Sequence, residues 1–407
     1  MNNRQKRGVS PLKDINLKNM AAGFVAGIFI ITGPSALILE AANNGNFTIA
    51  QTVGWIFSVY VFGGLLGIIL PLYYRLPIVG GHSLTGVAFL AAITAQFTFT
   101  ELIGAYVVSG ILMFLIGALG LFEKLMNLIP KEIISAMLAG MITKYMVNFV
   151  ISITEMLVIG GLALAVFFLF SKWKTRIPPV IAAIVTGFIV LILTYPLNSG
   201  EWASGAILQQ MTVPDFNIAS VLSVSVPLAL LILSNDAAIA VGALKQNRYR
   251  TPVNRIISLS GLLSIVTSFF GGQSANIAGM GTAICADEEA GPKEKRYMGA
   301  VAAGFLLLIF GLFSWKLVPL IQALPQEFIA IIVGFSLIGV FANCLQQSFS
   351  KPTMKLSAAF TFIIAFSNIT LFHISAPVWA LLIGALITRL IENNPVGKWQ
   401  KEGEKSA

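Results

Sequence analysis

Two four-residue phrases combine residue types and spacing that suit the binding of a small polar molecule. Gly80-Gly81-His82-Ser83 and Gly271-Gly272-Gln273-Ser274 are each followed by a run of small apolar residues. About 190 residues and an odd number of expected membrane spans separate them, so the second phrase lies upside down relative to the first. Inverted, glycine-interrupted segments in matching places are typical of transporters that bind their substrate at mid-membrane. The phrases therefore predict an architecture and the location of a site.

The chemistry expected at this site is anion binding by helix N-termini. We expect each phrase to lead into a half-helix, with Ser83 and Ser274 as the N-caps. Two helix N-termini offer free N–H groups and partial positive charge, and would attract an anion without any arginine. Six side chains are then expected to face the cavity: His82, Ser83, Thr85, Gln273, Ser274 and Asn276. In the alternative interpretation, the paired glycines permit close helix packing and the polar residues only cap.

A single acid, Asp236, lies near the middle of an apolar stretch, directly after Asn235. A charged carboxylate at membrane depth is costly unless it is paired, hydrated or protonated, so we expect Asp236 to couple transport to protons. The alternative role is a structural hydrogen bond to a neighbouring Asn or Ser. The matching place in the first half holds Gly33-Pro34-Ser35, which predicts a kink or break in the helix. We expect Ser35 and Asn235 to line the same cavity.

Composition indicates the class of protein that must position these residues. The chain has 407 residues, of which 57% are hydrophobic and only 11% charged, and its mean hydropathy is +0.85. Apolar runs of about 20 residues recur throughout, the length that a helix needs to cross a membrane. The net charge of +9 does not indicate nucleic acid, because the basic residues gather in short loops and tails. The two cysteines, Cys285 and Cys344, have no metal-ligand spacing.

The predicted fold is an all-α polytopic membrane protein of fourteen transmembrane segments, arranged as two inverted seven-segment repeats. The third and tenth segments are expected to be part strand and part half-helix. The first seven segments are expected at 20–40, 51–71, 76–93, 101–121, 131–150, 155–171 and 178–196, and the next seven at 221–243, 253–267, 268–286, 298–317, 326–345, 355–371 and 376–393. The chain then divides into a basic tail (1–19), a first repeat (20–196), an outer loop (197–220), a second repeat (221–393) and a second tail (394–407).

Charge placement predicts the orientation. With both termini in the cytoplasm, nearly all loop lysines and arginines fall on the inner side, and the loop Leu197–Asn217 contains neither residue. Lys144 and Lys316 are the exceptions. The expected location is the inner (plasma) membrane of a bacterium. No phosphate-binding Gly-Lys-Ser/Thr motif, hydrolase motif or cofactor motif occurs, so we expect neither an ATP-driven pump nor an enzyme, and no cofactor.

Three stretches resemble a known family. The most specific runs from Gly261 to Phe313, through Phe270-Gly271-Gly272 and an acidic loop, and the others begin at Ile129-Pro130 and at Tyr74-Arg75-Leu76-Pro77. Together they resemble the BenE-type benzoate/proton symporters over nearly the whole chain. That family is similar to the wider group with the uracil-permease fold. The resemblance implies a core of segments 1–4 and 8–11, a gate of segments 5–7 and 12–14, substrate between half-helices 3 and 10, and a homodimer.

One feature departs from the family pattern. Family members tend to carry Gln-Asn-x-Pro-Gly in segment 8, where this chain has Ser234-Asn235-Asp236-Ala237-Ala238. An anionic Asp236 would repel a carboxylate substrate, so we expect the acid to be protonated when substrate binds, or to accept the coupled proton. The function expected from the sequence is proton-coupled symport of a small organic anion such as benzoate. The alternatives are a nucleobase or inorganic-anion permease of the same fold, and an uncoupled anion channel.

Overall fold

The computed structural model describes residues 11–128, 130–173, 178–195, 210–372 and 374–392. Within this part of the chain, seven helical stretches are long and apolar enough to cross a membrane, as expected of a polytopic membrane protein. They are α1 (Leu17–Asn44), α2 (Ile49–Tyr74), α4 (Phe99–Ala118), α6 (Lys131–Glu155), the stretch Ile218–Gln246, the stretch Lys293–Leu312 that contains α14 (Tyr297–Leu312), and α16 (Gln326–Ser348).

The stretch Ile218–Gln246 is not a regular α-helix. It consists of α9 (Ile218–Ser220), a π-helical turn (Val221–Ser225), α10 (Val226–Leu231), a second π-helical turn (Ile232–Ala237) and α11 (Ala238–Gln246). The second π-helical turn contains Asp236. Such turns occur mostly inside α-helices and frequently at functional sites.

Two short strands and two half-helices lie in the middle of the molecule. Strand β1 (Gly80–Gly81) precedes α3 (Leu84–Ile93), and strand β2 (Asn276–Ile277) precedes α13 (Gly279–Ala286). The strands pair antiparallel, although nearly 200 residues of chain separate them. Both helices are far shorter than the membrane core is thick. The prediction of a strand followed by a half-helix in each half of the chain is therefore confirmed.

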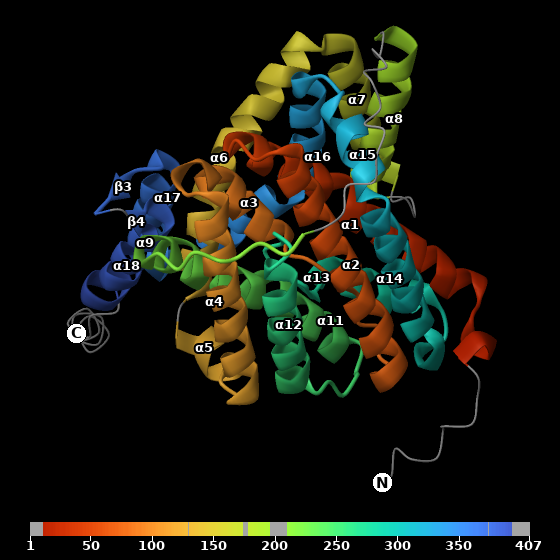
Figure 1. Ribbon diagram of the computed structural model, residues 1–407, viewed down its shortest axis with the longest axis horizontal. Coiled ribbons are helices and arrows are strands. Elements are labelled where there is room, and N and C mark those ends of the chain that lie inside the picture. Colours follow the sequence, from red (N-terminus) through yellow and green to blue (C-terminus); the bar gives the residue numbers. More distant parts are fainter. Residues whose placement is uncertain (1–10, 129, 174–177, 196–209, 373, 393–407) are drawn as a thin grey trace, which may run out of the picture.

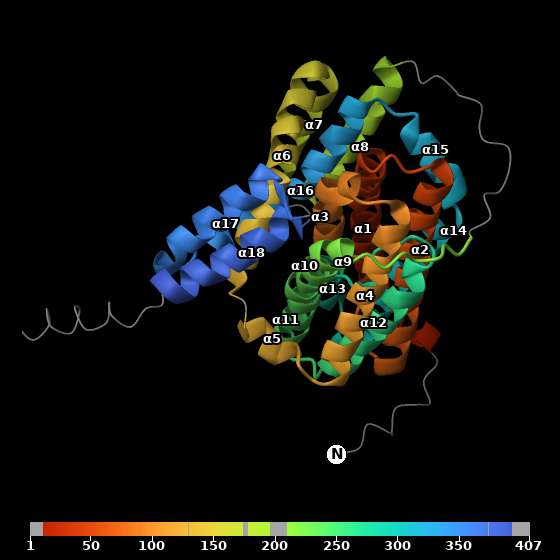
Figure 2. The ribbon, with the colours of Figure 1, turned by 60° about the vertical axis from the view of Figure 1, so that its left-hand side comes forward.

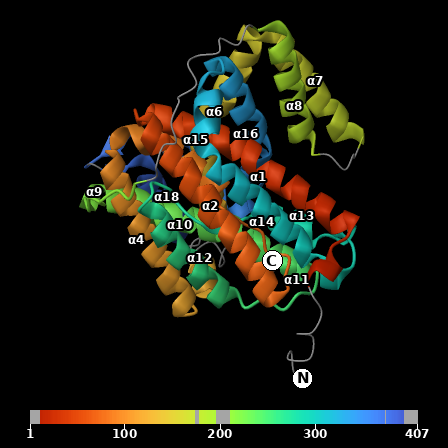
Figure 3. The same cartoon turned by 45° about the vertical axis from the view of Figure 1, so that its right-hand side comes forward.

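The helices pack as two groups (Figure 1). In the first group, α2 packs along α14, α4 along α12 (Val253–Ser268), and α1 against α3, α13 and α14. In the second group, α6 packs against α16 and α17 (Lys355–Ser367), α17 against α18 (Ala376–Ile387), and α7 (Leu157–Trp173) against α8 (Pro179–Thr194). Figure 2 shows α17 and α18 beside α6, and Figure 3 shows α7 and α8 together at one edge. The groups meet where α1 contacts α16 and α3 contacts α6.

Several smaller elements complete the described part of the chain. They include α5 (Phe122–Leu128), α15 (Ser314–Gln322) and a hairpin of β3 (Thr370–Leu371) and β4 (Ile374–Ser375). Short 3-10 turns lie at Pro11–Asp14, Thr94–Gln96, Glu288–Ala290, Lys293–Lys295 and Pro352–Met354, and a π-helical turn at Thr388–Glu392. We call the end of the bundle where α1 begins, near α5 and α11, the N-terminal face (Figure 1).

Each of the fourteen expected ranges contains helix, but the strand expected at the start of 268–286 is misplaced. Helix α12 continues to Ser268 and residues 269–271 form a turn, so the extended backbone begins later. Helix α1 runs through Pro34 without a break, so the predicted break is wrong, whereas the predicted kink stays a prediction. Residues 1–10 and 393–407 of the expected tails, and most of the expected loop 197–220, lie outside the described residues.

Candidate anion-binding site

The antiparallel strands bring the two half-helices together. Gly80 pairs with Ile277, and the N–H of Ala278 donates to Val79 O at 2.8 Å. A Cβ on Gly80 would lie 2.2 Å from the carbonyl oxygen of Gly63 in α2, so only glycine lets β1 approach this helix so closely. The strand pair thereby fixes where α3 and α13 begin.

Ser83 is the N-cap of α3, as predicted. Its Oγ accepts a hydrogen bond from the N–H of Gly86 at 2.9 Å. The same hydroxyl donates to Asp236 Oδ2 at 2.5 Å. The Thr85 Oγ1 atom lies 3.2 Å from Ser83 Oγ. Because the single Ser83 hydroxyl hydrogen goes to the carboxylate, Thr85 is the donor in this contact. Ser83 thus joins the start of α3 to an acid on another helix.

The predicted N-cap at Ser274 is wrong. Helix α13 begins at Gly279, and its N-cap is Ala278, four residues after Ser274. The difference arises because Gly271 adopts a left-handed conformation (φ +92°) and ends α12 in a turn, whereas Gly80 lies in a strand. The two phrases therefore share residue letters but occupy different places relative to their half-helices.

Ser274 nevertheless contributes to the same network as Ser83. Its Oγ accepts a hydrogen bond from the Ser83 N–H at 3.3 Å and donates to Asn276 Oδ1 at 2.7 Å. The Asn276 amide then donates to Ile277 O at 3.0 Å. All three residues are buried, and hydrogen bonds to buried polar groups fix their positions. The structure thus brings both predicted phrases into contact through Ser83 and Ser274.

Asp236 lies at the junction of the two half-helices. Its carboxylate accepts a hydrogen bond from the hydroxyl of Ser83, the N-cap of α3. It also interacts with the N–H of Gly279, the first residue of α13. A Cβ on Gly279 would lie 2.9 Å from the Asp236 carbonyl oxygen, so the close approach of α13 to the π-helical turn requires glycine. Asp236 is partly accessible, not fully buried. The Asp236 carboxylate thus lies beside the N-termini of α3 and α13, where the partial positive charge of both helices favours an anion.

His82 and Gln273 form a separate chain of hydrogen bonds with Trp55 of α2. The Trp55 Nε1–H donates to Gln273 Oε1 at 2.6 Å, and Gln273 Nε2 lies 3.2 Å from His82 Nδ1. An indole only donates, so the Gln273 amide must present its NH₂ to the imidazole, and His82 Nδ1 must accept. The neutral His82 then carries its hydrogen on Nε2, which has no partner among the described residues.

Among the described residues, Ser35 and Asn235 form their hydrogen bonds with partners other than the Asp236 carboxylate. The Ser35 hydroxyl bonds to Tyr60 OH of α2 at 2.8 Å and donates to Ile31 O at 2.6 Å. The Tyr60 ring meets the His82 ring edge-on, with centroids 5.0 Å apart. The Asn235 amide reaches Leu231 O, at 3.4 Å, and Ser234 Oγ, at 3.3 Å. The carboxylate network therefore contains Ser83, Thr85, Ser274 and Asn276, whereas His82, Gln273 and Ser35 contact α2.

Sequence reasoning missed three residues of the site. Trp55 and Tyr60 carry polar atoms within an apolar helix, and such atoms usually find a hydrogen-bond partner when buried, so their residue types were a usable signal. Gly279 gave no such signal, because its role depends on the distance between α13 and the π-helical turn. Within the described residues, no three His, Cys, Asp or Glu side chains are grouped to hold a metal ion.

Comparison with known proteins identifies the family. The family model described as the benzoate membrane transport protein, BenE, matches residues 13–390. The chain belongs to the benzoate membrane transport family. Its relatives include the inner membrane protein YdcO of Escherichia coli (strain K12), 31% identical over 90% of this chain and 94% of that protein. The benzoate membrane transport protein of Acinetobacter baylyi is 25% identical over 92% of this chain and 95% of that protein.

The fold of this benzoate transport family member is shared with a solved structure. The transmembrane domain of a cyanobacterial bicarbonate transporter, BicA, aligns with a TM-score of 0.57 at 15% identity, and the alignment covers 90% of this chain and 97% of that one. The likeness shows a common fold. Together with the family match, it shows a membrane transport protein and not an enzyme.

Proposed function

We propose that this protein is a proton-coupled symporter for a small organic anion, benzoate or a related aromatic carboxylate, in the bacterial inner membrane. The observation that carries the proposal is the Asp236 carboxylate at the junction of two half-helix N-termini. This position suits the carboxylate of a substrate equally well. The similarity to an inner membrane protein supports the proposed location, and the similarity to a benzoate membrane transport protein supports the proposed substrate.

Coupling follows from competition between two carboxylates for the same donors. The Ser83 hydroxyl already donates a hydrogen bond to Asp236, and the Gly279 N–H interacts with the same carboxylate. A substrate carboxylate about 4 Å from an ionised Asp236 would meet a repulsion of about 4 kcal/mol at an effective dielectric constant of 20. That repulsion would weaken binding by roughly a thousandfold. A proton on Asp236 removes the repulsion and frees the donors, so proton and anion bind together, each favouring the other.

The proposed architecture is the full set of fourteen segments in two inverted repeats, 20–196 and 221–393. Helix pairing supports it. The second segment (α2) packs along the eleventh (α14), and exchange of the two repeats converts this pair into the ninth and fourth segments (α12 and α4), which also pack together. The antiparallel pairing of β1 with β2 fits the same inversion. We extend the proposal to a moving core and gate, to cytoplasmic termini and to a homodimer.

The test is uptake of labelled benzoate into proteoliposomes, with and without an inward proton gradient. We expect the gradient to drive accumulation by the wild type. Asp236→Asn cannot take up a proton, so it should only equilibrate the substrate. Asp287→Asn is the matched control, because Asp287 is an exposed acid that caps a 3-10 turn outside the site. Gradient-driven accumulation by Asp236→Asn would refute the role given to this acid.

The same experiment separates the alternatives. An uncoupled anion channel would conduct benzoate equally with Asp or Asn at 236, and a gradient would drive no accumulation. A nucleobase or inorganic-anion permease would leave benzoate outside, while a thermal-shift screen with uracil, bicarbonate and sulfate would reveal binding. If one of these ligands raises the melting temperature of the wild type but not that of Ser83→Ala, the proposed site is correct and the proposed substrate is wrong.

A further inference from the structure

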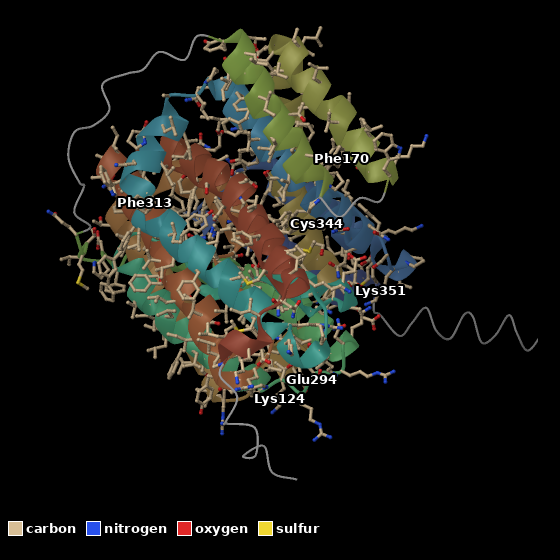
Figure 4. The ribbon with its side chains drawn as sticks, turned by 90° about the vertical axis from the view of Figure 1, so that its right-hand side faces the viewer. Lys124, Phe170, Glu294, Phe313, Cys344 and Lys351 are labelled. Atoms are coloured by element: carbon tan, nitrogen blue, oxygen red, sulfur yellow. The ribbon has the colours of Figure 1, made fainter. Side chains whose placement is uncertain are left out.

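A cavity of about 290 Å³ opens at the N-terminal face, and its lining includes the first residue of α12, from the first group of helices, and the first residue of α6, from the second. One wall comes from α11 and the start of α12, and the other from α5 and the first residue of α6. Figure 4 shows Lys124, which belongs to α5, at this end of the molecule. Ala238, Val241, Gly242 and Lys245 contribute the α11 wall. This helix follows directly on the π-helical turn that contains Asp236.

The lining residues of α11 form one helix face that leads from the site to the cavity mouth. Positions 238, 241, 242 and 245 follow the i, i+3, i+4, i+7 spacing of a single face. Asn235 precedes them by one turn, next to Asp236, and is partly accessible. Ten residues of helix from Asn235 to Lys245 span about 15 Å. The face therefore runs from Asn235, beside the partly accessible Asp236, to the surface, and only small or aliphatic residues lie between.

Gly242 marks the open part of this face. A Cβ added there would meet nothing within 4 Å among the described residues. At Gly279, the first residue of α13, an added Cβ would by contrast lie 2.9 Å from the carbonyl oxygen of Asp236. The missing side chain at 242 thus leaves space in the cavity, whereas the missing side chain at 279 permits packing.

The charges at the mouth favour anions. Lys131 and Lys245 line the cavity, and Glu123 is the one acid among its described lining residues. Lys245 pairs with Glu123 at 3.7 Å, and in the described part of the chain Lys131 has no carboxylate within ion-pair distance. Helix α6 begins at Lys131 after Pro130, whose side chain cannot cap, so the helix adds partial positive charge. The lining thus has an excess of positive charge, and such a cleft raises the local concentration of anions.

We propose that this cavity is the N-terminal-face mouth of the anion pathway, where Lys131 and Lys245 form a weak, transient site for carboxylates that pass along the Gly242 face. The inference rests on the proposed function, and adds a second site on the route to Asp236. A carboxylate at the mouth takes the place of Glu123 beside Lys245. The residues between the mouth and Asn235 offer no charge, so the anion does not stop there.

The test measures how fast a cysteine at 242 reacts with two thiol reagents of similar size and opposite charge. The Gly242→Cys variant is treated with anionic sulfonatoethyl and cationic trimethylammonioethyl methanethiosulfonate. The native Cys285 and Cys344 are buried, and the wild-type chain measures their background. We expect the anionic reagent to react about tenfold faster, relative to free cysteine as a standard, because the mouth is positive. Millimolar benzoate should slow both reactions.

Two further variants make the result specific. Adding Lys131→Gln and Lys245→Gln to Gly242→Cys should abolish the preference for the anionic reagent. The Gly161→Cys variant is the control, since Gly161 in α7 also has no atom within 4 Å of an added Cβ among the described residues but lies outside this cavity. It should show no anionic preference that depends on the two lysines.

The outcomes separate this inference from the proposed function, because labelling requires no transport. Equal rates for both reagents, or no reaction at residue 242 in a protein that elutes as a folded species, would overturn the inference. A lysine-dependent anionic preference without benzoate uptake by the wild type would support the mouth and refute the substrate. Gly242→Leu, which fills the path, should reduce uptake at least tenfold, whereas Gly161→Leu should not.

Discussion

The most informative single change is Ser83→Ala, because Ser83 joins the N-cap of α3 to the carboxylate of Asp236. The substitution removes two interactions. Loss of the N-cap acceptor for Gly86 N–H costs about 1 kcal/mol of stability. Loss of a hydroxyl donor to an ionised carboxylate removes about 1.5–3 kcal/mol from the charged form of that carboxylate. The second effect acts on coupling, and the first acts on folding.

The sign of the coupling effect follows from the donor. The Ser83 hydroxyl stabilises the ionised form of Asp236, so its removal favours the protonated form. If substrate binds with a proton, uptake falls at the alkaline end of its pH profile, where Asp236 loses the proton. At about 1.4 kcal/mol per pH unit, the alkaline limb of the Ser83→Ala profile should move upward by about one to two pH units.

The assay is initial benzoate uptake into proteoliposomes over a pH series at a constant proton gradient. Thr48→Ala is the matched control, because Thr48 caps α2 through a bond from Gln51 N–H at 3.2 Å and lies outside the site. It should lose comparable stability and keep the wild-type profile. Ser83→Thr keeps a hydroxyl and should also keep the profile. An unchanged or acid-shifted profile for folded Ser83→Ala would refute the competition between Asp236 and substrate.

Two further changes test the packing around the site and the second group of helices. Gly279→Ala places a Cβ 2.9 Å from Asp236 O, so α13 must move away from the π-helical turn, at a cost of about 1–3 kcal/mol of stability. Because this movement displaces one wall of the site, the affinity for benzoate should fall. The control variant, Gly161→Ala, should change neither the thermal stability nor the affinity. Glu132→Gln breaks the 2.8 Å ion pair between Glu132, whose side chain is 7% exposed, and Lys351, so the unfolding temperature should fall clearly while the benzoate affinity stays unchanged. A wild-type melting temperature for Glu132→Gln would show that this pair adds no stability.

Local chemistry was enough to predict where helices form and which of them are short. Apolar runs of membrane length gave helical ranges that agree with α1, α2, α6 and α16 within a few residues at most ends. Ser83 was recognised as an N-cap because a serine before an apolar run can cap within its own turn. Such features depend on residues that are close together in the sequence, so they can be predicted from the sequence alone.

The sequence could not show which of two similar phrases would be a strand and which a turn. Gly-Gly permits both, and the choice was made by packing. Gly80 lies against Gly63 of α2, while Gly271 turns beside Phe99, whose ring would lie 2.8 Å from an added Cβ. For this reason the prediction failed at Ser274 and succeeded at Ser83.

The sequence by itself determined a membrane protein of many helices, two half-helices preceded by extended backbone, and one acid in an apolar stretch. Those properties follow from composition and from the cost of exposing polar groups to lipid. Only the tertiary structure decided what Asp236 touches. Ser83 lies 153 residues before it, and α13 more than forty residues after it, so their meeting depends on the pairing of β1 with β2. Contacts between such distant segments leave no local pattern in the chain, because the energy that selects them comes from packing the whole bundle.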